Sequence, residues 1–209
     1  MTRRAVAQPS QHPHAERGLD LYETPAVAVR ALLQAEWLPH RIWEPACGPG
    51  SIVRELRAAG RHVFASDVKD YGGSQSLTSD FFTIREAPLG FETAITNPPY
   101  KHAAEFTLHA LDLVPRVIML LPLRFLEAGT GTTAAAKARA VLLDDGHLAR
   151  VHVFKERLPM MHRDGWDGPV NTSSQSFAWM CWERSWKGPA QFHRISWKES
   201  AAPVREAAE

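Results

Sequence analysis

The chain has 209 residues, 22% charged residues and a formal net charge of +1, which suits one domain with a sizeable core and excludes a chain disordered throughout. A net charge so close to zero does not by itself indicate nucleic-acid binding, so evidence for such binding must come from local clusters of basic residues. Cys47 and Cys181 do not make a disulfide framework and no apolar run approaches a membrane span, so we expect a reduced, cytoplasmic setting and no membrane partner.

The two ends of the chain are polar and lack periodicity. Residues 1–18 are rich in Arg, His, Gln and Pro, and residues 199–209 are polar and Ala-rich, so each end is predicted to be a flexible tail. A single domain is therefore expected over residues 19–198. His12 and His14 have no cysteine or carboxylate cluster beside them, so we assign no metal site.

The first predicted element is a helix from Ala26 to Trp37, where apolar residues recur at helical spacing. It follows Tyr22-Glu23-Thr24-Pro25, in which Thr24 is predicted to be the N-cap and Pro25 the first helical residue. Taken alone, this stretch also suits an ordinary capped helix.

A strand, a glycine turn and a helix come next. Residues 41–46 predict the first strand, Cys47-Gly48-Pro49-Gly50 breaks it, and residues 51–59 have helical character. Glycines let the backbone approach a ligand closely, so the turn is a candidate binding site. A tight turn without a ligand is an equal alternative.

Acidic residues follow the next two segments. The second predicted strand runs from His62 to Ser66 and ends in Asp67, where dinucleotide-binding folds hold the ribose hydroxyls. Further along, Asp80 could accept a hydrogen bond from an adenine amino group, and Phe81 could stack on its ring. The alternatives are a capping or loop aspartate at position 67, and a solvent-facing aspartate with two core phenylalanines at positions 80–82.

Asn97-Pro98-Pro99-Tyr100 directly follows a strand predicted over residues 92–96. Two prolines cannot continue a central strand, because neither donates a hydrogen bond, so the chain leaves the sheet at the edge where open α/β sheets bind ligands. The Asn97 amide oxygen and the Pro98 carbonyl could accept the two hydrogens of a planar amino group, while the Tyr100 ring could stack on a flat base. A strand-ending turn would use the same residue types.

The second half of the chain predicts helices over residues 103–113 and 134–143 and strands over residues 116–121, 148–154 and 176–182. From residue 116 to residue 163, eight Lys or Arg stand against four Asp or Glu, which makes this segment a candidate for phosphate contacts or simply a solvated surface. Arg124, Arg163 and Trp166 lie in the loops of this half.

Three of these motifs resemble those of a known family. Glu44-Pro45-Ala46-Cys47-Gly48-Pro49-Gly50 resembles the cofactor-binding glycine turn of S-adenosylmethionine-dependent methyltransferases. Asn97-Pro98-Pro99-Tyr100 resembles the catalytic motif of amino-methyltransferases, above all those that act on adenine in DNA. Residues 22–25 resemble the extra motif that precedes the glycine turn in many of these enzymes. The chain is similar in motif order and compact size to phage and prophage adenine methyltransferases, over roughly residues 22–183.

The resemblance implies an α/β, Rossmann-like class I methyltransferase fold, with a mostly parallel seven-stranded sheet and flanking helices. It implies methyl transfer from S-adenosylmethionine to the exocyclic amino group of adenine in DNA, by base flipping and direct in-line transfer without a metal. The implied cofactor-binding residues are Tyr22, Thr24, Glu44, Gly48, Gly50, Asp67, Asp80 and Phe81. The implied catalytic residues are Asn97, Pro98 and Tyr100, and the implied substrate-binding residues are Pro99, Arg124, Arg163 and Trp166.

Other acceptors stay open, because Asn-Pro-Pro-Tyr also occurs in protein glutamine methyltransferases and in some RNA amino-methyltransferases. A catalytically silent cofactor-binding subunit is a further alternative, which the intact Asn97–Tyr100 motif opposes, and a homodimer stays open too. No stretch is large enough for a separate target-recognition domain, so a short or relaxed DNA sequence is expected. Some adenine enzymes present a second ring after the sixth strand; residues 158–161 lack one, and Trp166 is the candidate substitute.

Overall fold

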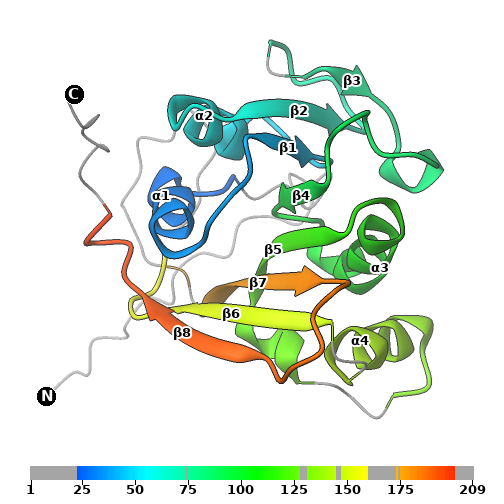
Figure 1. Cartoon of the computed structure of the whole chain (residues 1–209), viewed down its shortest axis with the longest axis vertical. Helices are drawn as coiled ribbons and strands as arrows, with labels where there is room; N and C mark the ends of the chain where they lie inside the picture. The colour runs from blue at the N-terminus through cyan, green and yellow to red at the C-terminus, as the bar shows by residue number, and fades with distance from the viewer. Residues whose placement is uncertain are drawn as a thin grey trace, which may run out of the picture.

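One mixed sheet with helices on both faces forms the centre of the molecule (Figure 1). The computed structural model describes residues 23–73, 75–127, 131–144, 147–159, 173 and 175–200. Its strands are β1 (Arg41–Glu44), β2 (His62–Asp67), β3 (Leu77–Thr78), β4 (Thr93–Thr96), β5 (Arg116–Pro122), β6 (Leu148–Phe154), β7 (Phe177–Glu183) and β8 (Gln191–Ile195). Its helices are α1 (Ala26–Ala35), α2 (Ser51–Ala58), α3 (Ala103–Leu113) and α4 (Ala134–Asp144), with the short 3-10 helices η2 (Phe81–Thr83), η3 (Tyr100–His102) and η4 (Leu123–Leu126).

The sheet has eight strands in the order β3-β2-β1-β4-β5-β7-β6-β8. β7 runs antiparallel to β5 and β6, and the other pairings of the described strands are parallel. From β3 to β5 the order is that of a doubly wound fold, and it reverses between β1 and β4. The predicted α/β, Rossmann-like architecture with a mostly parallel sheet is confirmed.

The prediction of seven strands is one short, and the weakest strands lie at the edges. β3 is two exposed residues paired with the end of β2. β8 pairs in parallel with β6, and its first four residues are exposed. Its residues Gln191, His193 and Arg194 interrupt any apolar alternation, so β8 depends on backbone pairing rather than on burial and leaves no pattern in the sequence.

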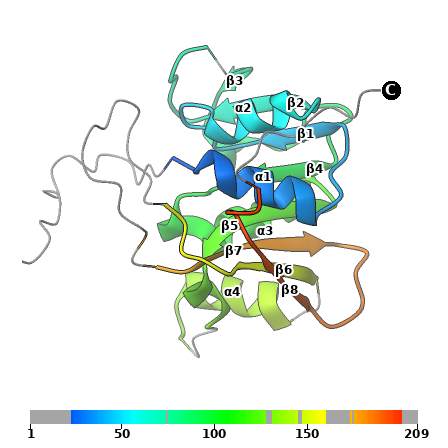
Figure 2. The same ribbon diagram turned by 90° about the vertical axis from the view of Figure 1, so that its left-hand side faces the viewer.

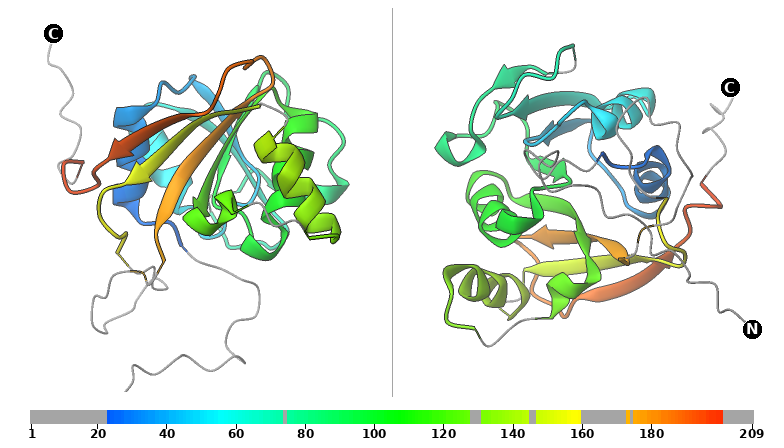
Figure 3. Two further views of the ribbon diagram at one scale, coloured as in Figure 1. Left: turned by 90° about the horizontal axis from the view of Figure 1, so that it is seen from below. Right: turned by 180° about the vertical axis from the view of Figure 1, so that it is seen from behind.

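The central strand β5 is buried on both faces, which explains its continuous apolar run. Val117, Met119 and Leu121 pack with α3 and α4 in one core cluster, and Ile118 and Leu120 pack with α1 and α2 in the other. The left panel of Figure 3 shows the sheet between these two helix layers, and Figure 2 looks onto the face covered by α1 and α2. Burying each large aliphatic side chain contributes about 1.5–3 kcal/mol, so the two clusters supply the main stabilisation of the sheet.

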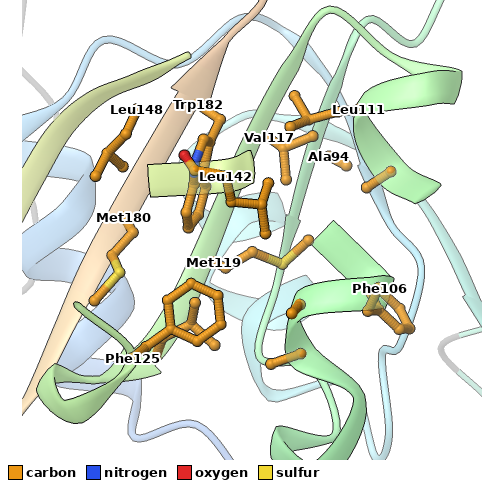
Figure 4. Packing of buried hydrophobic residues seen from close by; sticks show 14 of the residues in the cluster. Ala94, Phe106, Leu111, Val117, Met119, Phe125, Leu142, Leu148, Met180 and Trp182 are labelled. Atoms are coloured by element: carbon orange, nitrogen blue, oxygen red, sulfur yellow. The ribbon is translucent and has the colours of Figure 1, made fainter. Parts of the chain in front are cut away.

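Two buried tryptophans of β7 join the sheet to the helices on either side. Trp182 Nε1 donates to the carbonyl of Leu142 on α4 at 3.0 Å, and Trp179 Nε1 donates to the carbonyl of Ala28 on α1 at 2.9 Å. Figure 4 shows Trp182 beside Leu142 in the first core cluster. A buried indole N–H needs an acceptor, so these bonds fix both helices against the same strand.

A buried ion network lies at the amino-terminal edge of the sheet. The carboxylate of Glu36 accepts hydrogen bonds from Arg116, from Arg150 Nε at 2.9 Å and from His152 Nε2 at 2.6 Å. Glu183 pairs with the same two arginines. Burial alone would raise the pKa of Glu36, but the bonds from His152 and Arg150 and the charges of both arginines outweigh it and lower the pKa to about 2.

Cys181 also lies in this network, with Sγ 3.9 Å from Glu36 Oε2. The ligand atoms of Glu36, His152 and Cys181 are within 4.8 Å of one another, a spacing that could hold a metal ion. However, the guanidinium groups of Arg116 and Arg150 already pair with the Glu36 carboxylate. Burial also raises the pKa of the Cys181 thiol far above its usual range, which disfavours the thiolate that a metal ion would need. The cluster is therefore an ion network that joins α1 to β5, β6 and β7.

The boundaries at both ends differ slightly from those predicted. Pro25, not Thr24, occupies the N-cap of α1, with no side-chain cap, so the predicted cap is wrong by one residue. Ser200, placed in the predicted C-terminal tail, is 1% exposed and its Oγ lies 2.6 Å from Gln34 Oε1. The predicted tail over residues 1–18 and residues 201–209 lie outside the described residues. Within the described ranges, no helix is long and apolar enough to cross a membrane.

Candidate active site

A pocket of about 460 Å³ lies where the strand order reverses, at the carboxyl ends of β1, β2 and β4. Open α/β sheets bind ligands at this position, and the volume suits a small-molecule ligand. Three segments build most of the wall: the turn after β1, the loop that begins at Asp80, and the stretch from Asn97 to His102. The lining residues are Glu23, Thr24, Glu44, Pro45, Ala46, Cys47, Gly48, Pro49, Ser51, Ile52, Asp67, Val68, Tyr71, Asp80, Phe81, Phe82, Asn97, Pro98, Pro99, Tyr100, Lys101, His102 and Phe106.

The turn after β1 owes its shape to two glycines. Gly48 has φ 51° and Gly50 has φ 88°, both in the left-handed region that residues with side chains rarely adopt. Gly48 lines the pocket, whereas Gly50 does not and instead forms the N-cap of α2. Of the two predicted cofactor-binding glycines, the structure thus places Gly50 behind the wall, and Ser51 and Ile52 at the start of α2 reach the pocket instead.

Asp67 ties this turn to the end of β2. Its Oδ2 accepts a hydrogen bond from the backbone N–H of Gly48 at 2.9 Å, and its Oδ1 accepts one from Lys69 N at 3.1 Å. The backbone N–H of Cys47 also donates to the carbonyl of Ser66 at 3.0 Å. Asp67 is 8% exposed and lines the pocket. A carboxylate has about four acceptor positions, so Asp67 can hold the turn and still accept from a ligand.

Glu44 is the most deeply buried acid among the lining residues of the pocket. The side chain is 1% exposed, and its Oε2 has no hydrogen-bond partner among the described residues. Burial, and then the charge of Asp67, raises the pKa of Glu44 well above its usual value. In neighbouring Cys47, burial and the charges of Glu44 and Asp67 raise the pKa to about 12, so its thiol is not a nucleophile at neutral pH. A buried oxygen without a partner, in a pocket wall, indicates a place for a ligand donor.

The loop that begins at Asp80 forms the second part of the wall. Asp80 Oδ1 accepts from the N–H of Phe82 at 3.0 Å and caps η2. The Phe81 ring is 4% exposed and stacks on Phe106, with ring centroids 4.0 Å apart. Asp80 therefore caps a helix and Phe81 packs in the core, yet both also line the pocket. Phe82, considered above as a core residue, is 40% exposed and lines the pocket as well.

The stretch from Asn97 to Tyr100 forms the third part of the wall, directly after β4. All four of its residues line the pocket. Tyr100 begins η3, and its ring centroid lies 5.9 Å from that of Phe177 on β7. The exposed residues Lys101 and His102 continue the wall. An asparagine, two prolines and a tyrosine thus line one pocket together with the glycine turn.

The remaining predicted site residues divide into three groups. Thr24 is 6% exposed and lines the pocket. Arg124 is exposed on η4, after β5, and is not part of the pocket wall. Tyr22, Arg163 and Trp166 lie outside the described residues.

Several wall residues were not predicted from the sequence. Ser51, Lys101 and His102 directly follow the glycine turn and the Asn97–Tyr100 motif, so their position beside those motifs could have identified them. Tyr71, in the loop after β2, and Phe106, on α3, have no local signal, because only the fold brings them to the pocket.

No protein-family model and no curated protein sequence matches the chain. Among solved structures, it is similar to the modification subunit of a proposed type I restriction enzyme from Vibrio vulnificus YJ016, with 13% identity over 86% of this chain and 48% of that one and a TM-score of 0.51. It is similar to the M protein of the type I restriction enzyme EcoKI, with 13% identity over 87% of this chain and 50% of that one and a TM-score of 0.51. A proposed RNA methyltransferase from Pyrococcus horikoshii is 14% identical over 78% of this chain and 87% of that one, with a TM-score of 0.52.

The chain spans about half the length of the two restriction-enzyme subunits. At such low identities, similarity of structure shows the fold alone. Together with the strand order and the pocket at the switch between β1 and β4, it shows that the chain has the Rossmann-like fold of class I methyltransferases.

Proposed function

We propose that this chain transfers a methyl group from S-adenosylmethionine to the exocyclic amino group of adenine in DNA. The observation that carries the proposal is that one pocket contains both the glycine turn after β1 and the Asn97–Tyr100 stretch after β4. A ligand held by the first therefore lies next to whatever the second holds. The fold, shared with methyltransferases, supports the same reaction class.

The residues of the pocket fit S-adenosylmethionine, which has an amino group, a carboxylate, a ribose diol and a flat adenine. Glu44 Oε2 lacks a donor among the described residues and can accept from the amino group. The first turn of α2, which begins at Ser51, offers backbone N–H groups suited to a carboxylate. Asp67 keeps acceptor positions for the diol, and the ring of Phe82 offers exposed aromatic surface.

Each predicted cofactor residue then has a task. The backbone of Gly48 approaches the ligand closely, and Gly50 gives the turn its shape. Asp80 accepts from the adenine amino group, with Phe81 against its ring. Tyr22 and Thr24 lie toward the methionine part in this proposal. When bound, the cofactor supplies a methyl group activated by the sulfonium charge.

In this proposal, Asn97, Pro98 and Tyr100 bind the adenine that accepts the methyl group. The Asn97 amide oxygen and the Pro98 carbonyl accept the two amino hydrogens and so orient the nitrogen lone pair, while the Tyr100 ring stacks on the base. Pro99 adds apolar contact. A base inside a duplex cannot reach such a pocket, so the adenine flips out. Holding the two reactants in this geometry supplies most of the acceleration.

DNA is the favoured acceptor because two of the similar structures, a modification subunit and an M protein, belong to type I restriction enzymes, and each covers most of this chain. In this proposal Arg124 and Arg163 contact phosphates, and Trp166 lies beside the flipped base. The similarity to a proposed RNA methyltransferase keeps RNA as the second candidate.

The experiment is an incubation with methyl-labelled S-adenosylmethionine and, in parallel, duplex DNA, RNA and protein. We expect label in DNA, recovered as N6-methyladenine. A duplex with purine in place of adenine lacks the amino group and is the matched control, which should take up none. Label in RNA or protein alone contradicts DNA as the acceptor. Cofactor binding without transfer to any acceptor indicates a silent subunit.

A further inference from the structure

The wall from Asp80 to Phe82 is a short turn between the edge strand β3 and β4, and the Phe81 ring packs it against the core. Its hydrogen bonds are largely internal: Asp80 Oδ1 accepts from Phe82 N at 3.0 Å, and Thr83 Oγ1 donates to the carbonyl of Asp80 at 2.7 Å. These bonds give η2 its shape, but they do not fix its position relative to the rest of the pocket.

His109, on α3, joins this turn to the helix behind it. Its Nε2 lies 3.1 Å from the carbonyl oxygen of Phe81 and 3.0 Å from that of Ile84. A carbonyl oxygen can only accept, so Nε2 carries the hydrogen and donates to both. One imidazole N–H thus binds both ends of the turn: Phe81, the first residue of η2, and Ile84, which directly follows η2.

The rings around His109 place it behind the wall. It meets Phe81 edge-on, with centroids 4.9 Å apart and planes at 81°, and lies 5.8 Å from Phe82. Phe106, three residues earlier on the same face of α3, stacks on Phe81. Phe106 lines the pocket and His109 does not. The wall is therefore a layer of rings whose backbone is fixed by His109.

We propose that His109 is a positioning residue that sets the affinity of the pocket for the cofactor by fixing the Asp80–Phe82 wall. The inference rests on the proposed function, because it assigns this wall to the cofactor's adenine. His109 bonds the carbonyls of Phe81 and Ile84, on the side of the pocket assigned to the cofactor, so we expect it to act on cofactor binding and to leave the acceptor side at Asn97 unchanged.

Three variants separate the ring of His109 from its N–H. His109→Phe keeps a ring and removes the donor. His109→Gln places an amide N–H near the position of Nε2, whereas His109→Asn places it near Nδ1, too short to reach the two carbonyls. For each variant, calorimetry gives the Kd for S-adenosylmethionine, transfer assays give kcat and the KM of each substrate, and thermal unfolding gives Tm.

His109→Phe and His109→Asn are expected to bind the cofactor about tenfold more weakly, which corresponds to about 1.4 kcal/mol and to one hydrogen bond. His109→Gln is expected to stay within about threefold of the wild type, because it restores the donor. The KM for the cofactor rises with Kd, while the KM for DNA and kcat at saturating cofactor do not change.

Unchanged cofactor affinity in His109→Phe, measured well below its Tm, overturns the inference. Equal losses in His109→Gln and His109→Phe overturn it as well, and so does a fall of kcat together with changes in both KM values, which marks a general disturbance of the fold. If the wild type itself binds no S-adenosylmethionine, the proposed function fails. If it binds and the variants do not differ from it, only the role of His109 fails.

Discussion

The ion network around Glu36 makes a prediction about stability that does not depend on function. Glu36→Gln removes the carboxylate that Arg116, Arg150 and His152 share. Among the described residues, Arg116 and Arg150 would then keep Glu183 as their remaining carboxylate partner. Breaking a buried pair by removing one partner costs about 3–5 kcal/mol, so the free energy of unfolding should fall by about that amount at neutral pH.

The same network sets a pH dependence. The pKa of Glu36 is lowered from 4.5 to about 2. At about 1.4 kcal/mol for each tenfold change in proton affinity, the ionised carboxylate stabilises the folded state by about 3.5 kcal/mol. Because the folded-state pKa is depressed, this contribution is complete above 4.5 and is lost as the pH falls toward 2. At about pH 3.5, about 1.5 kcal/mol of it is gone.

Urea unfolding of the wild type and Glu36→Gln, at about pH 7 and about pH 3.5, measures this effect. The gap in unfolding free energy between the two proteins should narrow by about 1.5 kcal/mol at the lower pH. Glu55→Gln is the matched control, because Glu55 pairs with Arg30 at 2.7 Å in a more exposed position. It should change stability by about 1 kcal/mol or less. A gap between wild type and Glu36→Gln that is the same at both pH values would refute the reasoning.

Three further predictions concern the pocket. Tyr100→Phe should keep most activity and Tyr100→Ala should lose about 1–3 kcal/mol in kcat/KM, since the ring stacks on the base; equal damage would point to the hydroxyl. Asp67→Ala should weaken cofactor binding at least several-fold, because a charge-assisted bond is worth about 1.5–3 kcal/mol. Asp67→Asn, which can still accept from Gly48 N, should lose less, and calorimetry showing equal affinity in all three proteins would remove Asp67 from the site. Because burial raises the pKa of Glu44, its carboxyl costs stability as the pH rises above the unfolded-state value of 4.5. Glu44→Gln should therefore gain stability relative to the wild type with rising pH, and denaturant unfolding that shows a flat or falling difference contradicts this.

Local chemistry explains what the sequence could predict. Two prolines must leave a sheet, so the position of Asn97 at the end of β4 follows from the chain itself. The turn at Gly48 needs a positive φ, which glycine supplies, and the continuous apolar run of residues 116–121 identifies a strand that is buried on both faces. These signals lie within a few residues of the features they predict.

What the sequence could not predict depends on contacts between distant residues. The bond from Asp67 to Gly48 and the network around Glu36 both need the sheet to be assembled first. His109 reads as one more residue on a helix face, and only the fold shows that its N–H meets the carbonyls of Phe81 and Ile84. The spacing of residues along the sequence does not indicate which backbone carbonyls a helix side chain such as His109 will contact.

The most direct test of the proposed chemistry is mass spectrometry of DNA nucleosides after incubation with S-adenosylmethionine, for the wild type and for Asn97→Ala. We predict N6-methyladenine with the wild type and none with Asn97→Ala, although calorimetry should show nearly unchanged cofactor affinity in that variant. Wild-type turnover by Asn97→Ala, or methylation of a ring atom instead of the amino group, would contradict the role given to Asn97.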